Sequence, residues 1–114
     1  MENYLLLLHG NGRYSTLSPE EMQATFARYR NWGQKLREAG RMAGSNKLED
    51  GSGRVLSGQN GGLHITDGPY AETKDVVGGY YLINAESYEE AVELARDCPH
   101  VDFGVIEIRR VEKM

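Results

Sequence analysis

The chain has little cysteine, little proline and no excess of basic residues. Its 114 residues include one cysteine, Cys98, and three prolines. A single cysteine excludes an internal disulfide framework and favours a reducing compartment. The 13 Lys and Arg residues are outnumbered by 17 Asp and Glu residues, which gives a net charge of −4. We therefore expect no nucleic-acid partner, since such a partner would require a clustered basic face.

Long apolar segments are also missing. The run from Tyr4 to Leu8 is far shorter than the ~20 residues that cross a bilayer. Met1 to Asn3 carry no basic residue ahead of it, so no signal peptide is expected. These features favour a cytoplasmic protein without a membrane partner, folded as a single domain over residues 1–114.

Apolar runs and glycine or proline stops predict a mixed order of elements. Ser18 and Pro19 form a helix start, and Gly40 ends that helix after about Ala39. A second helix is expected between Ser87 and Pro99. Strands are expected over residues 4–8, 41–49, 54–56, 63–67, 76–85 and 105–111. A stripe in the first helix is expected to pack on the sheet and not to bind a cofactor: Met22, Phe26, Tyr29, Trp32 and Leu36.

This order predicts the fold and the assembly. It is the split βαβ arrangement of a ferredoxin-like α+β sandwich, β-α-β-β-α-β, with an extra hairpin inserted between its halves. Two helices cover only one face of such a sheet, whereas residues 4–8 and 76–85 are apolar on both faces. We therefore expect a homodimer in which two copies pack sheet on sheet, forming a dimeric α/β barrel.

Two residues at strand ends are candidates for acid–base catalysis. His9 and Asp67 both stand beside glycine-rich breaks, and a carboxylate would orient a histidine that moves protons. The alternative role for Asp67 is to cap its own Gly-Pro turn. His9, His64 and Asp67 lack the close spacing of a metal motif, so neither a metal nor a cofactor is expected.

Other polar residues are candidate ligand contacts. They are His64, Tyr70, Glu72, Lys74 and Tyr81. Glycine weakens a strand, so the pair Gly78-Gly79 predicts a bulge or a close backbone approach by a partner chain or a ligand. His100 is expected to be solvated on a surface loop, and Cys98 to be a buried, inert thiol.

The segment from Thr66 to Lys74, TDGPYAETK, followed by Val77-Gly78-Gly79-Tyr80-Tyr81, resembles the signature of the DGPF family of the YciI-like (YCII-related) group. The resemblance covers nearly the whole chain. It implies small bacterial proteins with a dimeric α/β-barrel fold, often encoded near extracytoplasmic-function sigma factors. It also implies a His–Asp pair in a cleft of a barrel similar to that of muconolactone isomerases.

Two departures from that family's pattern matter. Tyr70 stands where the signature has phenylalanine, and residues 22–30 contain no histidine, although the wider group has one near the start of the first helix. Only Asp67 together with His9 or His64 can replace the implied pair. Two functions follow: a lyase- or isomerase-type enzyme acting on a small molecule, or a non-catalytic dimer that binds a small molecule or a regulatory partner in sigma-factor signalling.

Overall fold

A computed structural model describes residues 1–10, 16–58, 61–68 and 76–114. Its elements follow in this order: β1 (Glu2–His9), α1 (Pro19–Glu38), β2 (Met42–Lys47), β3 (Arg54–Ser57), β4 (His64–Asp67), β5 (Val77–Ala85), α2 (Tyr88–Ala95), the 3₁₀ turn η3 (Pro99–Asp102) and β6 (Val105–Arg110). Every helix and strand expected from the sequence is present.

Four strands form one antiparallel sheet in the order β2-β5-β1-β6, and β3 and β4 pair in a separate hairpin. Numbered without the hairpin, the sheet has the 4-1-3-2 strand order of the ferredoxin-like sandwich. The prediction of that fold with an inserted hairpin is confirmed.

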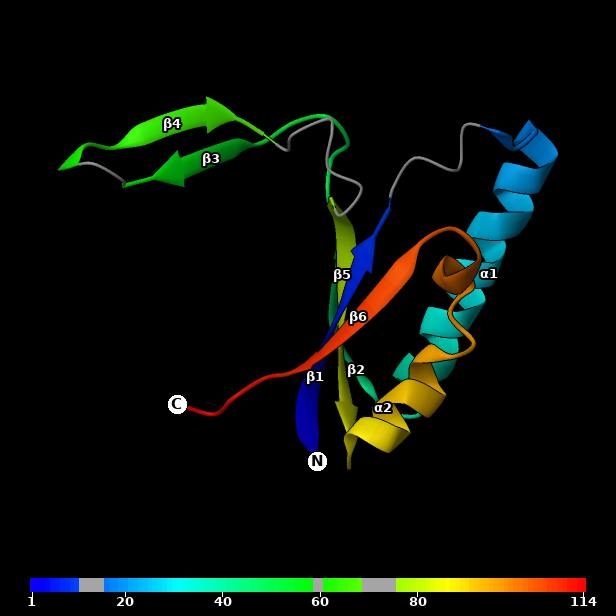
Figure 1. The fold of residues 1–114 in the computed structure, drawn as a ribbon. Coiled ribbons are helices and arrows are strands. Elements are labelled where there is room, and N and C mark those ends of the chain that lie inside the picture. The colour runs from blue at the N-terminus through cyan, green and yellow to red at the C-terminus, as the bar shows by residue number, and fades with distance from the viewer. Residues whose placement is uncertain (11–15, 59–60, 69–75) are drawn as a thin grey trace.

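Both helices lie on one side of the sheet (Figure 1), and both start where their caps predict. Ser18 and Glu21 form a capping box at α1, and Gly40, at φ +72°, follows its last turn. Ser87 accepts a hydrogen bond from the backbone of Glu90 at α2. The Trp32 indole then joins the helices by donating to the Leu94 carbonyl at 2.9 Å.

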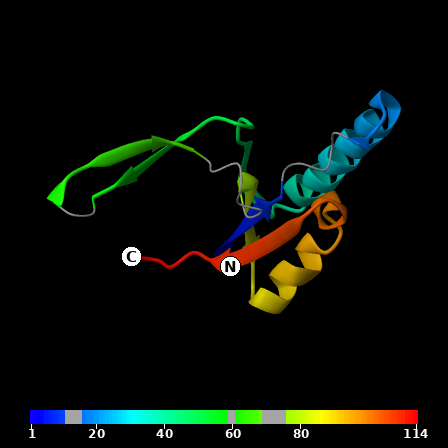
Figure 2. The ribbon, with the colours of Figure 1, turned by 45° about the horizontal axis from the view of Figure 1, so that its top comes forward.

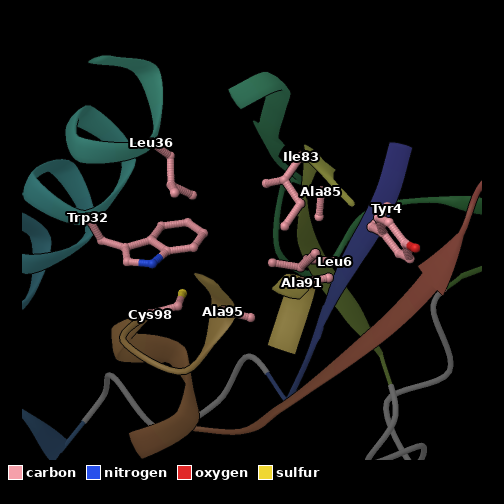
Figure 3. Close-up of a cluster of buried hydrophobic side chains, with 9 residues drawn as sticks. All are labelled: Tyr4, Leu6, Trp32, Leu36, Ile83, Ala85, Ala91, Ala95 and Cys98. Atoms are coloured by element: carbon pink, nitrogen blue, oxygen red, sulfur yellow. The ribbon is translucent and has the colours of Figure 1, made fainter. Parts of the chain in front are cut away.

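The core lies between the helices and the sheet. In Figure 3, Trp32 and Leu36 of α1 point toward Leu6 and Ile83 of the central strands. Fully buried side chains include those of Tyr4, Leu6, Ile83 and Cys98. Burial of Cys98 confirms the expected buried thiol, and desolvation raises its pKa to about 11.

The second face of the sheet has no helix on it in the described part of the chain (Figures 1 and 2). Alternation along β1 directs Tyr4, Leu6 and Leu8 to the helices and leaves Leu5 and Leu7 half-buried on the opposite side. The cross-strand partners of these two leucines are Leu82 and Tyr80. We call the surface formed by Leu5, Leu7, Tyr80 and Leu82 the open face.

The hairpin β3–β4 stands apart from the sheet, on the side opposite the helices (Figures 1 and 2). It gives the molecule a radius of gyration of 16.1 Å, against roughly 13 Å for a compact domain of this length. Neither helix of the described residues has the length and apolarity required to cross a membrane.

Candidate functional site

A cavity of about 570 Å³ lies between the first half of α1 and strands β2 and β5. Met22, Phe26 and Tyr29 line it from the helix, and Leu8 and Tyr81 line it from the sheet. The expectation that the whole α1 stripe packs into the core is therefore wrong. Trp32 and Leu36 are buried, whereas Phe26 is 45% exposed, because the cavity separates this half of α1 from the sheet.

A backbone irregularity forms one wall of this cavity. Opposite β1, the register moves from Leu8↔Gly79 to His9↔Val77, so Gly78 is the extra residue of a bulge. A Cβ on Gly79 would lie 3.0 Å from the Asn46 carbonyl oxygen of β2. The bulge predicted for this glycine pair is present, and the backbone that lies close to Gly79 is that of β2 in the same chain. Neither glycine places a side chain in the cavity.

The cavity has one charged end. Ser45, Lys47 and Asp50 line it there, and Lys47 Nζ lies 3.2 Å from Asp50 Oδ1 and 3.0 Å from the Leu48 carbonyl oxygen. The Lys47 and Asp50 side chains are 63% and 61% exposed. An exposed ion pair of this kind is worth little energetically, so Lys47 is available to exchange Asp50 for an anionic ligand group.

His100 lies in the cavity wall. The prediction that it is solvated on a surface loop is therefore wrong. Its side chain is buried because η3 packs against α1. Nε2 lies 2.7 Å from the His9 carbonyl oxygen and must donate to it, so in the neutral ring Nδ1 accepts from the Tyr29 hydroxyl at 3.2 Å. Desolvation lowers the pKa of His100 below its usual 6.5, which keeps the ring neutral at pH 7 and Nδ1 able to accept a proton.

A second histidine, His9, pairs with the carboxylate of Glu107 beside the open face. His9 Nε2 and Glu107 Oε1 are 2.9 Å apart, with side chains 17% and 41% exposed. The hydrogen bond from His9 is the largest cause of the lowered pKa of Glu107. Glu107 was missed from the sequence, although the alternation of β6 places it on the same face as Leu7, its register partner.

The remaining candidates are divided between the cavity and the hairpin. Tyr81 lies in the cavity, where its ring meets Trp32 edge-on at 4.8 Å. Asp67 and His64 lie on β4; the Asp67 carboxylate is 3.4 Å from Arg54 and 93% exposed. Among the described contacts within one chain, Asp67 therefore does not pair with His9. Tyr70, Glu72 and Lys74 lie outside the described residues, as does the Pro69 of the turn that Asp67 was expected to cap.

A model of the YCII-related domain matches residues 3–114. An uncharacterised protein of Rhizobium meliloti is 43% identical over 47 residues, which are 40% of this chain and 38% of that protein. The match thus spans well under half the length of this curated relative. Among solved structures, 5-chloro-2-hydroxyhydroquinone dehydrochlorinase of Burkholderia phenoliruptrix AC1100, in complex with 2,5-dihydroxybenzoquinone, superposes with a TM-score of 0.54 and 14% identity. That match covers 96% of this chain and 93% of the dehydrochlorinase, and at this identity it supports the fold alone.

Proposed function

Since this chain belongs to the YCII-related domain family, we propose that it binds a small, flat organic molecule in the cavity between α1 and the sheet. The observation that carries the proposal is the cavity itself. Its volume of about 570 Å³ lies within the roughly 300–1,000 Å³ that is typical of small-molecule sites.

The lining of the cavity favours an aromatic or quinone-like ligand with an acidic group. Phe26, Tyr29 and Tyr81 offer ring faces and edges for stacking. At the charged end, Lys47 Nζ would meet a carboxylate, phenolate or enolate oxygen of the ligand. The ligand of the dehydrochlorinase, 2,5-dihydroxybenzoquinone, has this chemistry and is a suitable first probe.

Binding is tested by a thermal-shift screen of aromatic acids, phenols and quinones, followed by calorimetric titration of the compounds that stabilise the protein. Phe26→Ala removes a stacking surface worth about 0.5–1.5 kcal/mol, which weakens Kd about 2- to 12-fold. Lys47→Met is expected to weaken acidic ligands selectively. Val92→Ala, 44% exposed on α2, is the control. Unchanged affinity in both cavity variants would reject this site.

We further propose that the bound molecule undergoes proton transfer of the lyase or isomerase type. The hydrogen bond between Tyr29 and His100 in the cavity wall supports this second function. A ligand hydroxyl would give its proton to Tyr29 Oη while the Tyr29 proton moves to His100 Nδ1. The resulting imidazolium keeps its Nε2–H on the His9 carbonyl. Protonation of Nδ1 in acid blocks the relay, so turnover should rise with pH through the lowered pKa of His100.

Two pairs compete for this role, and variants separate them. Tyr29→Phe and His100→Gln should abolish turnover if the cavity pair moves the proton, with ligand affinity largely retained. His9→Ala and Asp67→Asn should abolish it if the pair predicted from the sequence does so, and Glu107→Gln then reports on the observed partner of His9. If the parent protein binds a ligand but neither it nor any variant turns the ligand over, the non-catalytic function is supported. That function includes a regulatory role in sigma-factor signalling.

We propose that the protein is a cytoplasmic homodimer. The lone, buried Cys98 needs no oxidising compartment. The leucines and Tyr80 of the open face form a connected apolar surface on a sheet that carries helices only on its other side, and pairing with a second open face would cover it. Sedimentation equilibrium at micromolar concentration tests the dimer, and single subunits at every concentration would reject it.

A further inference from the structure

The hairpin β3–β4 has an apolar face that packs on little within its own chain. The register pairs Leu56 with Ile65, and their side chains are directed to the same face because cross-strand partners share a face. Leu56, Leu63 and Ile65 are 62%, 66% and 61% exposed. A two-stranded hairpin alone is marginally stable in water, so this one requires a surface to pack on.

The direction of the hairpin indicates which surface is available. It projects from the sheet toward the side of the open face, away from both helices, in the two views of Figures 1 and 2. Whatever covers the open face therefore comes to lie beside the hairpin. In a twofold-symmetric pair of chains each hairpin meets the other chain in the same way.

Charge also favours a second copy over an unrelated partner. The hairpin carries an Arg54–Asp67 ion pair on the face of Leu56 and Ile65. The edge of the sheet beside the open face carries Glu107 and Arg109, 3.4 Å apart. Each surface thus presents one cation and one anion beside apolar side chains. The two surfaces can therefore pair opposite charges with each other, whereas a partner of a single charge sign would meet one like charge on each of them.

We infer that the β3–β4 hairpin is a dimerisation arm that packs its Leu56–Ile65 face on a second copy of this chain. The inference rests on the homodimer proposed above and deepens it: the open faces form the centre of the interface, and the exchanged arms extend it. The large radius of gyration is then that of one half of an assembly, because the arm packs on the partner chain and not on its own.

The arm is tested by sedimentation equilibrium of the full chain. The double variant Leu56→Ser/Ile65→Ser should raise the dimer Kd at least 10-fold, since two arms are altered in each dimer. The control is Val101→Ser, an apolar residue of η3 that is 52% exposed and lies on the helix side. Circular dichroism establishes that each variant is folded.

A labelling measurement keeps the inference testable if the double variant unfolds. Ile65→Cys introduces one accessible thiol, while Cys98 remains buried. Its reaction with a maleimide should be at least 10-fold slower above the dimer Kd than below it, and that of Val101→Cys should not change. A parent protein that is monomeric at all concentrations overturns both the dimer and the arm. A dimeric parent in which Ile65→Cys reacts equally fast in both states overturns the arm alone.

Discussion

Replacing Gly104 by alanine should destabilise the protein far more than a surface glycine substitution does. Gly104 precedes β6 and lies where the end of β1 meets the His100 ring. A Cβ placed there would overlap the His9 carbonyl oxygen and approach His100 Nε2 to 2.9 Å. The oxygen belongs to the backbone of a central strand, so it has little freedom to move.

The magnitude follows from two costs. Overpacking a filled site costs about 1–3 kcal/mol. Separating His100 Nε2 from the His9 carbonyl leaves a buried donor unsatisfied, at about 1–3 kcal/mol more. The sum, about 2–6 kcal/mol, is a large part of the 5–15 kcal/mol typical of a domain. With a urea m-value of about 2 kcal/mol/M, it should lower the urea midpoint by about 1–3 M.

The assay is urea unfolding at a fixed protein concentration, because association would make the midpoint concentration-dependent. Gly44→Ala is the matched control, since a Cβ there has nothing within 4 Å and should change stability by only a few tenths of a kcal/mol. Equal midpoints for the two variants would refute the described packing of His100 against β1.

Three further predictions concern pH, the thiol and a helix cap. His100 has a pKa below 6.5 in the folded state, so its contribution to stability is complete above about pH 6.5 and falls as the pH drops toward the folded pKa; urea midpoints at pH 7.5 and 5.5 should differ less in His100→Gln than in the parent. With a pKa of about 11, about one Cys98 thiol in 1,000 is ionised at pH 8, so Ellman's reagent should react only as fast as the protein opens, and complete reaction within seconds would contradict the burial. Ser18→Ala removes the capping box of α1 and should cost about 1 kcal/mol in thermal or urea unfolding, whereas Ser52→Ala, at an exposed position between β2 and β3, should cost almost nothing.

The sequence was sufficient for the fold because local signals and the sheet pattern agree. Ser18-Pro19 and Ser87 place both helix starts, and the short apolar runs between glycine and proline stops place the strands. The strand order then follows from the split βαβ pattern. The bulge at Gly78 was also predictable, because glycine weakens the interior of a strand and therefore often marks a bulge or a close backbone approach.

The site was less predictable because its residues meet through tertiary packing. His100 follows Cys98 and Pro99 in a short segment without periodicity, and only the packing of η3 on α1 brings its ring to Tyr29 and to the His9 carbonyl. The α1 stripe has the same spacing throughout, so periodicity alone could not show that Phe26 lines a cavity while Leu36 is buried. The pairing of Asp67 with Arg54 depends on the register of the hairpin, which the glycine-rich tip did not reveal. The catalytic roles of His9 and Asp67 stay predictions.

The most direct test of the account is to map a bound ligand by ¹H–¹⁵N chemical-shift perturbation, with the strongest compound from the thermal-shift screen. We expect the largest shifts at the amides around the cavity, those of Phe26, Tyr29, Gly79 and Tyr81. At a ligand concentration that saturates these shifts in the parent protein, the shifts in Phe26→Ala should remain below saturation because its affinity is lower. Shifts confined to the hairpin, or to Leu5 and Leu7 on the open face, with the amides of Phe26, Tyr29, Gly79 and Tyr81 unmoved, would contradict the claim that this cavity is the binding site.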